Sequence, residues 1–407
     1  MRRRCLTPLL CLATLAAAPA KPARHAALPP LTIALDLALS GPGADENIRA
    51  RNGALLAIAE ANDAGGIGGH GIAVAHDPDT TDATSAADAA RVAHALAADA
   101  SVLAIIGPDR SALAQPMLPI INEAGLAMIS PAAAAAALTA VATAAINRPT
   151  GRLTFFRLVA PDSFQGIGLA DYWATARNLK TAYILDDGSA YGTRLANAFA
   201  QRATRQGMQI LGHETVNRAN LADPSFTAAL QKSAAQAIFF GGTDQVGLPL
   251  MQQLYAAMPN AIKGGGDGLY GPEVLTAVGF PAAAGWVIAT GTPHLLASAA
   301  TAPFIAAYQK RFGQMPDDFA MTGYDAADIV LAAIRTIIGA GDVPTRETIR
   351  STIAEQTVDT VQGRIGFDPN GDLRVKPVSL FVLRAAPGAP ADDMDADFAY
   401  LGPAPLD

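Results

Sequence analysis

Cysteine is almost absent from this chain of 407 residues, which contains only two, Cys5 and Cys11. Both fall inside the N-terminal leader described below, so the mature chain carries none. Disulfide bonds, which are common in oxidising compartments, are therefore excluded as a source of stability. A chain of this length can bury a core large enough to fold without them, and its length suggests two or three domains.

Motifs for metal, nucleotide or nucleophilic chemistry are also lacking. The 6 histidines show no paired spacing, so a metal site would depend on scattered carboxylates, and we expect none. Gly66–Gly71 has the letters of a dinucleotide fingerprint, but it follows a predicted helix and precedes a predicted strand, the reverse of a phosphate loop. Gly264–Gly268 lacks the Lys-Ser/Thr of a P-loop, and no serine occupies a G-x-S-x-G elbow. We expect no cofactor and no catalysis, although the missing motifs leave a hydrolase unsupported rather than excluded.

Basic charge and long apolar runs are both scarce. The chain has 29 Lys and Arg against 36 Asp and Glu, for a net charge of -7. An acidic surface argues against nucleic acid and anionic lipid as partners. Beyond the leader, no apolar run approaches the roughly 20 residues that a membrane-spanning helix needs. We therefore expect a soluble mature protein.

The first 20 residues have the pattern of a secretory leader. Arg2–Arg4 form a positive region, residues 6–18 form a short apolar run, and Ala18-Pro19-Ala20 is a small-residue cleavage pattern. The apolar run is too short to span a bilayer. We predict a signal peptide over residues 1–20, cleaved after about Ala20, and a periplasmic mature protein.

What the chain does have is a regular alternation of strand-like apolar runs with helical patterns. The predicted strands span residues 31–39, 72–76, 102–106, 126–129, 155–159, 182–185, 237–240 and 286–290. Strands separated by helical patterns indicate βαβ units and a mainly parallel sheet. These βαβ units are too many for a single sheet, so we predict an α/β fold with two lobes.

Three segments interrupt this regularity. Pro119 lies inside the helix expected after Ser111 and should kink that helix or delay its start. Ala132–Ala137 is a run of alanines that predicts a mobile surface excursion. The tail after Arg384 is rich in Pro, Ala and Asp, and we predict that it is loosely held.

The stretch from Gly107 to Ala132 places two loops at neighbouring strand ends, one carrying Ser111 and the other Ser130-Pro131-Ala132. In an open α/β sheet, ligands bind outside the carboxyl ends of the strands. A helix start at that edge offers backbone N–H groups and a hydroxyl to an anion. The stretch therefore predicts a carboxylate cradle and no catalytic centre. Ser111 is also a candidate helix cap, a role compatible with ligand binding.

Eleven short fragments follow one another in a recognisable order: Leu39–Pro42, Asn62–Ile67, Ala114-Gln-Pro116 through Ile129-Ser-Pro131, Phe156-Arg157, Asp162–Gly166, Tyr191-Gly192, Phe239–Gly242, Gly266–Gly268, Tyr324–Ala326, Gly366–Asp368 and Asn370–Asp372. Together they resemble the periplasmic branched-chain amino-acid-binding family, the leucine/isoleucine/valine-binding components of ABC importers. The resemblance implies a type I periplasmic-binding-protein fold, in which two doubly wound α/β lobes with mainly parallel sheets are joined by a three-crossover hinge. It implies ligand capture by closure of the lobes, without catalysis.

The same resemblance implies a domain plan. Residues 31–158 and 292–355 would form the first lobe, residues 159–291 and 356–385 the second, and residues 386–407 a loose tail. The protein would be a monomer that delivers a small-molecule ligand to an ABC permease in the inner membrane. A ligand-sensing or regulatory envelope protein that uses the same fold without transport is the alternative.

Ligand roles carry over from the family residue by residue. Ser111 matches a serine that binds the ligand's carboxylate, and Ala132 matches a backbone contact. Tyr191 matches a tyrosine that closes over the ligand, and Asp267 lies where an acid pairs with the ligand's ammonium group. Asp162 is a further ligand-binding candidate. An ordinary turn for Asp267 and a half-buried core position for Tyr191 are the alternatives.

Three positions depart from the family. Ala134 replaces a threonine hydroxyl, Thr243 replaces a second-lobe tyrosine, and a residue at about Glu46 replaces a first-lobe aromatic. Arg110 is a candidate to supply the lost anion contact, although a solvated arginine is the commoner case. These replacements make the predicted pocket more polar than a leucine pocket should be. We therefore expect a polar ligand, an amino acid or amide, in place of leucine, isoleucine or valine.

Overall fold

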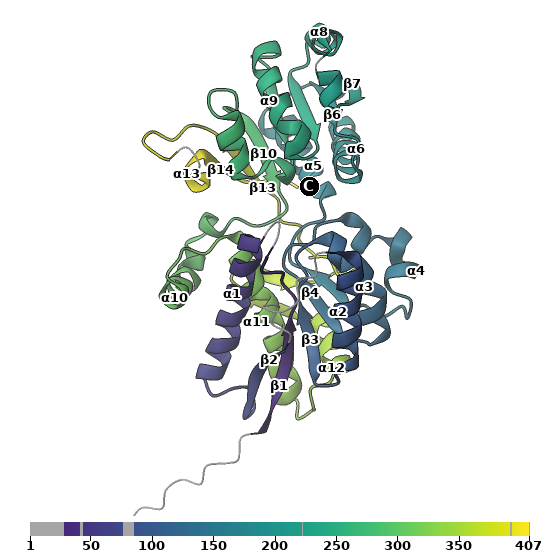
Figure 1. Cartoon of the computed structure of the whole chain (residues 1–407), viewed down its shortest axis with the longest axis vertical. Coiled ribbons are helices and arrows are strands. Elements are labelled where there is room, and N and C mark those ends of the chain that lie inside the picture. Colours follow the sequence, from purple (N-terminus) through teal and green to yellow (C-terminus); the bar gives the residue numbers. More distant parts are fainter. Residues whose placement is uncertain (1–27, 41–43, 76–84, 222, 391–392, 407) are drawn as a thin grey trace, which may run out of the picture.

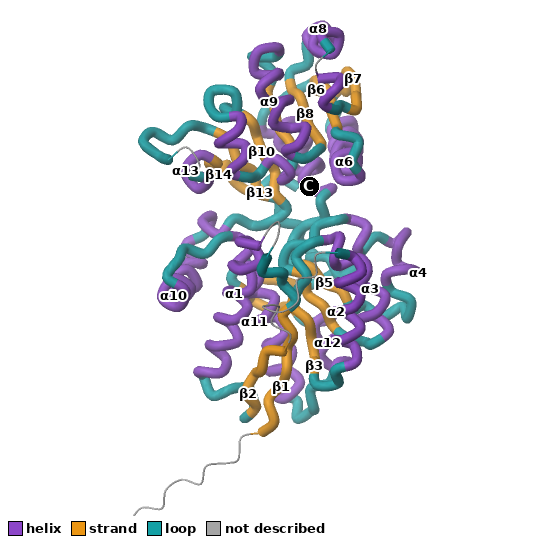
Figure 2. Tube along the Cα trace, in the orientation of Figure 1, coloured by secondary structure: helices purple, strands orange, loops and turns teal. Residues whose placement is uncertain are grey.

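The computed structural model describes residues 28–40, 44–75, 85–221, 223–390 and 393–406, which form two lobes stacked along the long axis (Figure 1). The predicted signal peptide, residues 1–20, and its cleavage site lie outside these ranges. In each lobe, helices cover a central sheet on both faces (Figure 2). Within the described ranges, no helix combines the length and the apolar character needed to cross a bilayer.

The first lobe is built on a five-stranded sheet in which every pairing is parallel. Its order is β2-β1-β3-β4-β5, with β1 at Leu28–Leu35, β2 at His70–Ala75, β3 at Val102–Ile106, β4 at Ala127–Ser130 and β5 at Phe155–Arg157. These strands are near-continuous apolar runs because both faces of a parallel sheet are buried. One face packs on α1 (Ala44–Asp63), α11 (Asp318–Gly339) and α12 (Arg346–Glu355), and the other on α2 (Ala86–Ala98) and α3 (Ser111–Glu123).

Helices α1 and α11 pack unusually closely, and glycine permits it. A Cβ atom on Gly53 of α1 would lie 2.0 Å from the carbonyl oxygen of Ala320 in α11. A Cβ atom on Gly323 of α11 would lie 2.0 Å from the carbonyl oxygen of Ala50. The reciprocal contact fixes the start of α1 beside the start of α11, which brings their acidic first turns together at the edge of the cleft.

The second lobe is built on a seven-stranded sheet with the order β14-β13-β10-β9-β8-β6-β7. The parallel strands are β6 (Thr181–Asp186), β7 (Gln209–Thr215), β8 (Ala237–Gly241), β9 (Ile262–Gly265) and β10 (Trp286–Thr290), followed by antiparallel β13 (Ser379–Leu383) and β14 (Phe398–Pro403). Helices α5 (Ser163–Asp171) and α6 (Ala190–Arg205) cover one face. The other face packs on α7 (Arg218–Leu221), α8 (Pro224–Ser233) and α9 (Asp244–Ala257).

The chain passes between the lobes three times: after β5, after β10 and before β13. The three crossings are bonded to one another. The amide of Ala160 donates to the carbonyl of Gly291 (2.8 Å), and the Ser379 hydroxyl donates to the carbonyl of Thr292 (2.6 Å). The predicted fold class, with two mainly parallel α/β lobes and a three-crossover hinge, is confirmed.

The predicted lobe boundary at residue 356 is wrong. A hairpin of β11 (Thr357–Thr360) and β12 (Gly363–Gly366) follows α12 and packs on the first lobe. Phe367 is buried in the first-lobe core, with its ring centroid 4.9 Å from that of Phe156. The chain returns to the second lobe only before β13, because the apolar side chains up to Leu373 are buried in the first-lobe core.

The predicted loose tail is also wrong in part. After α13 (Met394–Asp397), strand β14 pairs with β13 at the edge of the second-lobe sheet. Phe398 is buried there, with its ring centroid 4.7 Å from that of Tyr270. The Pro, Ala and Asp around this strand obscure its short apolar stretch, and only the neighbouring strand supplies its hydrogen-bond partners.

Helix α3 begins at Ser111 and runs through Pro116 and Pro119 to Glu123, so the delayed start predicted from Pro119 does not occur. Both prolines lack an N–H group to donate to the preceding turn. The buried face of the helix, which includes Leu113, Met117, Leu118 and Ile121, compensates for those missing bonds.

Candidate functional site

Two adjoining cavities lie between the lobes, at the carboxyl ends of the parallel strands. One, here the Ser111 cavity, has a volume of about 420 Å³ and is lined by Ser111 and Tyr191 among others. The second, here the Asp317 cavity, has a volume of about 610 Å³ and is lined by Asp317. Glu46, Ala132, Ala134, Asp267 and Phe319 line both, so the two cavities are direct neighbours. The size of each is typical of small-molecule sites.

The first-lobe wall of the Ser111 cavity is formed by the start of α3 and the loop after β4. The Ser111 hydroxyl accepts a hydrogen bond from the amide of Ala135 (3.0 Å) and makes no cap to its own helix. Because a hydroxyl both donates and accepts, its hydrogen is still available to an anion. The Ser130 hydroxyl donates to the carbonyl of Pro108 (2.6 Å) and accepts from the amide of Ala133 (2.9 Å). The two loops that the sequence places at neighbouring strand ends are thus bonded together.

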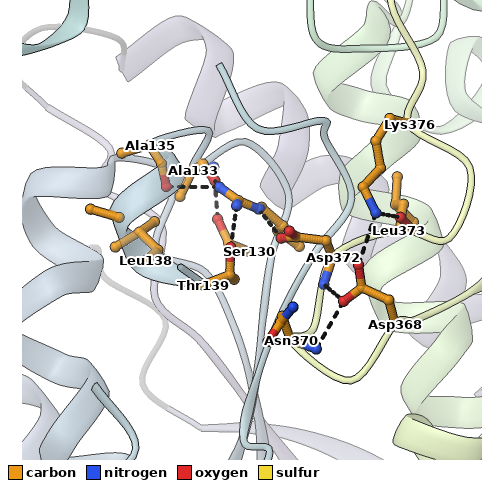
Figure 3. Close-up of polar contacts among 12 residues, drawn as sticks. Ser130, Ala133, Ala135, Leu138, Thr139, Asp368, Asn370, Asp372, Leu373 and Lys376 are labelled. Atoms are coloured by element: carbon orange, nitrogen blue, oxygen red, sulfur yellow. Dashed lines mark hydrogen bonds and ion pairs between the residues drawn. The ribbon is translucent and has the colours of Figure 1, made fainter. Parts of the chain in front are cut away.

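The buried guanidinium of Arg157 holds the alanine run Ala132–Ala137 by donating to the carbonyls of Ala133 and Ala135. Figure 3 labels both alanines. Arg157 is 0% exposed, and it donates to the carbonyl of Ala135 (2.9 Å) and to the Thr139 hydroxyl (2.5 Å). Ala133 is buried as well. The prediction of a surface excursion is therefore wrong, because Arg157 satisfies the carbonyls that would otherwise need water.

Arg157 also ties this loop to the hinge through Asp372, Asp368 and Lys376, which are labelled in Figure 3. Its Nε atom pairs with Oδ1 of Asp372 (2.6 Å), and the amide of Asp372 donates to Asp368 (3.2 Å). The other Asp368 oxygen pairs with the ammonium of Lys376 (2.9 Å), which lies on the third crossing. The alanine run and the hinge therefore share one hydrogen-bonded network.

The second-lobe wall carries Tyr191 and Asp267, and both bond to Gln165, which is fully buried and lines neither cavity. Asp267, which follows β9, accepts from the hydroxyl of Tyr191 on α6 (2.7 Å) and from the amide of Gln165 on α5 (2.5 Å). Burial raises the pKa of Asp267, and the bonds from Tyr191 and Gln165 oppose that rise. Burial, together with the Asp267 charge, also raises the pKa of Tyr191 well above its usual range, so its hydroxyl stays a donor. The predicted pair is brought together, whereas the sequence analysis missed Gln165.

Asp162 also lines the Ser111 cavity and pairs with Arg194 of α6 (2.8 Å). Asp162 is 3% exposed, and its Oδ1 atom accepts no hydrogen bond from the described residues. The sequence analysis missed Arg194, although it lies three positions after Tyr191 and hence on the same helix face. Arg110 lines the cavity from the first lobe, with its Nε atom 3.7 Å from Asp109.

Glu46, in the first turn of α1, is surrounded by other carboxylates. Burial between the lobes raises the pKa of Glu46 to about 7, with further increases from Asp317 and Asp109, while Arg49 opposes the rise. Burial also raises the pKa values of Asp109 and Asp317. The site therefore holds more negative charge than its cations compensate.

Thr243 does not line either cavity, contrary to prediction. It precedes α9, and its amide donates to Asp187 (3.0 Å). A Cβ atom on Gly268 would lie 3.1 Å from the α-carbon of Thr243, so Thr243 packs behind the loop that carries Asp267. The remaining predicted residues, Glu46, Arg110, Ser111, Ala132, Ala134, Asp162, Tyr191 and Asp267, all line the cavities.

Comparison with known proteins finds relatives along almost the whole chain. The family model described as "Periplasmic binding protein" matches residues 30–387. A Leu/Ile/Val-binding protein of Rhizobium johnstonii is 28% identical over 362 residues, covering 87% of this chain and 92% of that protein. A leucine-, isoleucine-, valine-, threonine- and alanine-binding protein of Pseudomonas aeruginosa is 27% identical over 346 residues, covering 84% and 87%.

Solved structures share the fold. An ABC transporter substrate-binding protein from Desulfitobacterium hafniense, in complex with Leu, superimposes with a TM-score of 0.73 at 24% identity, over 91% of this chain and 99% of that one. A solute-binding protein from R. palustris in complex with benzoate gives 0.65 at 21% identity, over 92% and 96%. The same architecture thus holds quite different ligands in these neighbours.

Proposed function

Because the chain belongs to the periplasmic binding protein family, we propose that it captures a small amino acid or amide-like ligand between its lobes and delivers it to an ABC permease. One observation carries the ligand assignment. The Asp267 carboxylate, held by Tyr191 and Gln165, lines the same cavity as the Ser111 hydroxyl. An acid on one lobe and an anion cradle on the other match the two charges of an α-amino acid.

In this proposal the ligand's carboxylate lies against the first-lobe wall. The Ser111 hydroxyl donates to it, and the amide of Ala132, whose hydrogen bond to the Ser130 hydroxyl is long at 3.4 Å, donates as well. Ala134 has no hydroxyl to add. Arg110 lines the same cavity and supplies positive charge. The ligand's ammonium group pairs with Asp267. Both charges must be paired because closure of the lobes removes them from water.

Ligand binding is coupled to closure in this arrangement. A molecule that contacts Ser111 on one lobe and Asp267 on the other gains both sets of contacts only when the lobes approach. It therefore shifts the equilibrium from open to closed by the difference in its affinity for the two states. The three crossings, bonded side by side, are the hinge about which the lobes turn. No chemical step is assigned to the protein.

Calorimetry of purified protein, refolded to remove carried-over ligand, tests this proposal against a panel of amino acids, amides and small organic acids. We expect at least one zwitterionic ligand to bind. Asp267→Asn should weaken it by more than about thirtyfold, because truncating one member of a buried charge pair costs about 2 kcal/mol or more. Asp342→Asn, an equal change of charge at an exposed loop, should bind as wild type does. Binding by no member of the panel, or wild-type binding by Asp267→Asn, contradicts the proposal.

We further propose export through the N-terminal leader, with a mature chain that begins at Lys21 and acts as a monomer. The leader's positive region, apolar run and cleavage pattern support the export step. The intact mass of the protein purified from the periplasm, followed by light scattering, tests both statements. A mass that retains residues 1–20, or a stable dimer, would contradict them.

A further inference from the structure

The Asp317 cavity is strongly and asymmetrically charged. Besides Asp267, it is lined by Asp45, Glu46, Asp317 and Asp318 of the first lobe and by Glu273 and Asp395 of the second. The basic residues of its lining are Arg49 and His294, and each already lies close to a carboxylate of the same lining. Arg49 pairs with Asp317 (3.0 Å), and Nδ1 of His294 lies 3.4 Å from Asp318. Among the described lining residues, no further cation is left for Glu46, Glu273 and Asp395.

The lining of the Ser111 cavity contains buried polar atoms that find no hydrogen-bond partner among the described residues. The Oδ1 atoms of Asp162 and Asp109, both in residues that line this cavity, are buried and accept no hydrogen bond from the described part of the chain. Buried carboxylate oxygens without a donor are costly. Nδ2 of Asn47 and Nε of Arg194, in the same lining, are buried donors without an acceptor among the described residues. A ligand that carries both N–H groups and carboxylate oxygens would relieve both costs, whereas an aliphatic ligand would relieve neither.

The acids are not arranged as metal ligands. Within the described ranges, no three His, Cys, Asp or Glu side chains are grouped closely enough to hold a metal ion. Apolar side chains are interspersed with the acids: Tyr270, Leu296, Met315, Phe319 and Met394 line the same cavity. Leu296 and Met315 are 51% and 43% exposed, so their side chains are accessible to a ligand in this cavity. Apolar surface edged by carboxylates suits an aliphatic chain that ends in an organic cation.

We propose that the ligand is an α-amino acid with a cationic side chain, of the lysine or ornithine type. The inference rests on the proposed function, since it places the α-carboxylate and α-ammonium groups between Ser111 and Asp267. The side chain then extends into the Asp317 cavity along its apolar residues, and its terminal ammonium lies among Glu46, Asp317 and Glu273. Because these acids come from both lobes, the distal cation adds a second electrostatic bridge across the closing cleft.

A neutral aliphatic side chain would fit this cavity poorly. Closure over it would exclude water from Glu46 and its neighbours without supplying a partner charge. The raised pKa of Glu46 has the same origin, because burial and adjacent carboxylates both disfavour its ionised form. A cation in this position would favour the ionised form of Glu46 and so lower its pKa.

The test compares amino acids that differ only in the distal cation. L-Norleucine is L-lysine without its ε-ammonium group, and L-norvaline is L-ornithine without its δ-ammonium group. By calorimetry at low salt, we expect the cationic member of at least one pair to bind more than about tenfold tighter, with an advantage that shrinks as salt is added. Glu46→Gln should weaken the cationic ligand by about tenfold and leave its neutral analogue unchanged. Glu123→Gln, the same change of charge on the exposed end of α3, should leave both unchanged.

The outcomes separate the two proposals. If norleucine or norvaline binds as tightly as its cationic counterpart, the cationic ligand is overturned while capture of an amino acid stands. If the cationic ligand binds tighter but Glu46→Gln has no effect, its placement in the Asp317 cavity is overturned. If no amino acid of either kind binds, the proposed function fails and the present inference fails with it.

Discussion

On the second-lobe wall of the cleft, the polar groups include the side chains of Tyr191 and Asp267, which bond to each other and to the buried Gln165. On the first-lobe wall, many of them belong to the main chain of the alanine loop, which Ser111 contacts from the side and Arg157 from behind. Two different constructions thus face the same cleft. The second wall depends on which side chains are present, and the first depends on where the backbone is held.

This difference predicts different responses to mutation. If the proposed function holds, replacing a side chain of the second wall should remove a ligand contact and leave the fold largely intact. Replacing the support behind the first wall moves several contacts together and lowers stability. Alanine is tolerated along the alanine run because the methyl groups contribute little to the polar surface of this wall. What matters is that the backbone N–H and C=O groups are held in place.

The largest effect is expected for Arg157→Met. Removing the guanidinium leaves the carboxylate of Asp372, which is 8% exposed, without its ionic partner and frees the carbonyl of Ala135. Breaking a buried ion pair on one side costs about 3–5 kcal/mol of the free energy of unfolding, measurable by urea denaturation. Arg364→Met is the matched control: its 3.9 Å pair with Asp359 is exposed, so the loss should stay below about 1 kcal/mol.

Combining Arg157→Met with Asp372→Leu sharpens that test. Removal of both charges leaves no unpaired ion, so much of the lost stability should return. The alanine run would nevertheless lack the support of the Arg157 guanidinium, and the affinity for ligand should stay low. Equal stability of Arg157→Met and wild type would show that the alanine run keeps its conformation without Arg157.

A smaller effect is expected for Tyr191→Phe on the other wall. The change deletes the hydroxyl that donates to Asp267 (2.7 Å) and accepts from the amide of Gly268 (3.2 Å). Hydrogen bonds to charged groups contribute about 1.5–3 kcal/mol, so calorimetry should show roughly a tenfold or greater loss of ligand affinity. Tyr183→Phe is the control, since that hydroxyl bonds to Glu214 outside both cavities. An equal loss of affinity in both variants would mean that Tyr191 acts only through stability.

The smallest effect is a pH dependence that originates at Glu46. Its pKa is raised to about 7 by burial and by Asp317 and Asp109, so below pH 7 it is mostly neutral. Affinity for a cationic ligand should therefore rise by about fivefold from pH 6 to 8, as Glu46 ionises. In the absence of ligand, the free energy of unfolding should change in the opposite direction and fall as the pH rises. The stability that proton binding by Glu46 contributes is fully present below pH 4.5 and is lost as the pH rises through about 7. Glu46→Gln should abolish both trends in calorimetry and thermal unfolding; their persistence would assign them to another group.

Much of the scaffold was predictable because buried parallel strands are local features. Val102–Ile106 and Trp286–Thr290 are strands over the predicted residues, since each is an apolar run bounded by polar or glycine residues. Eight of the nine candidate ligand residues line the cavities, the exception being Thr243. That they contact ligand is still a prediction. The errors at residues 356–373 and 398–403 arose where a short segment takes its partners from a distant part of the chain.

The sequence by itself determined the elements and the edge of the sheets at which a ligand would bind, because apolar periodicity and strand-end loops depend on neighbouring residues. Only the tertiary structure decided the partners of that site. Gln165 meets Asp267 across 102 positions and Arg157 meets Asp372 across 215, distances over which no local pattern carries information. The excess of carboxylates in the Asp317 cavity is likewise a sum over both lobes. Such charges interact strongly only when folding brings them close together in a volume from which water is partly excluded.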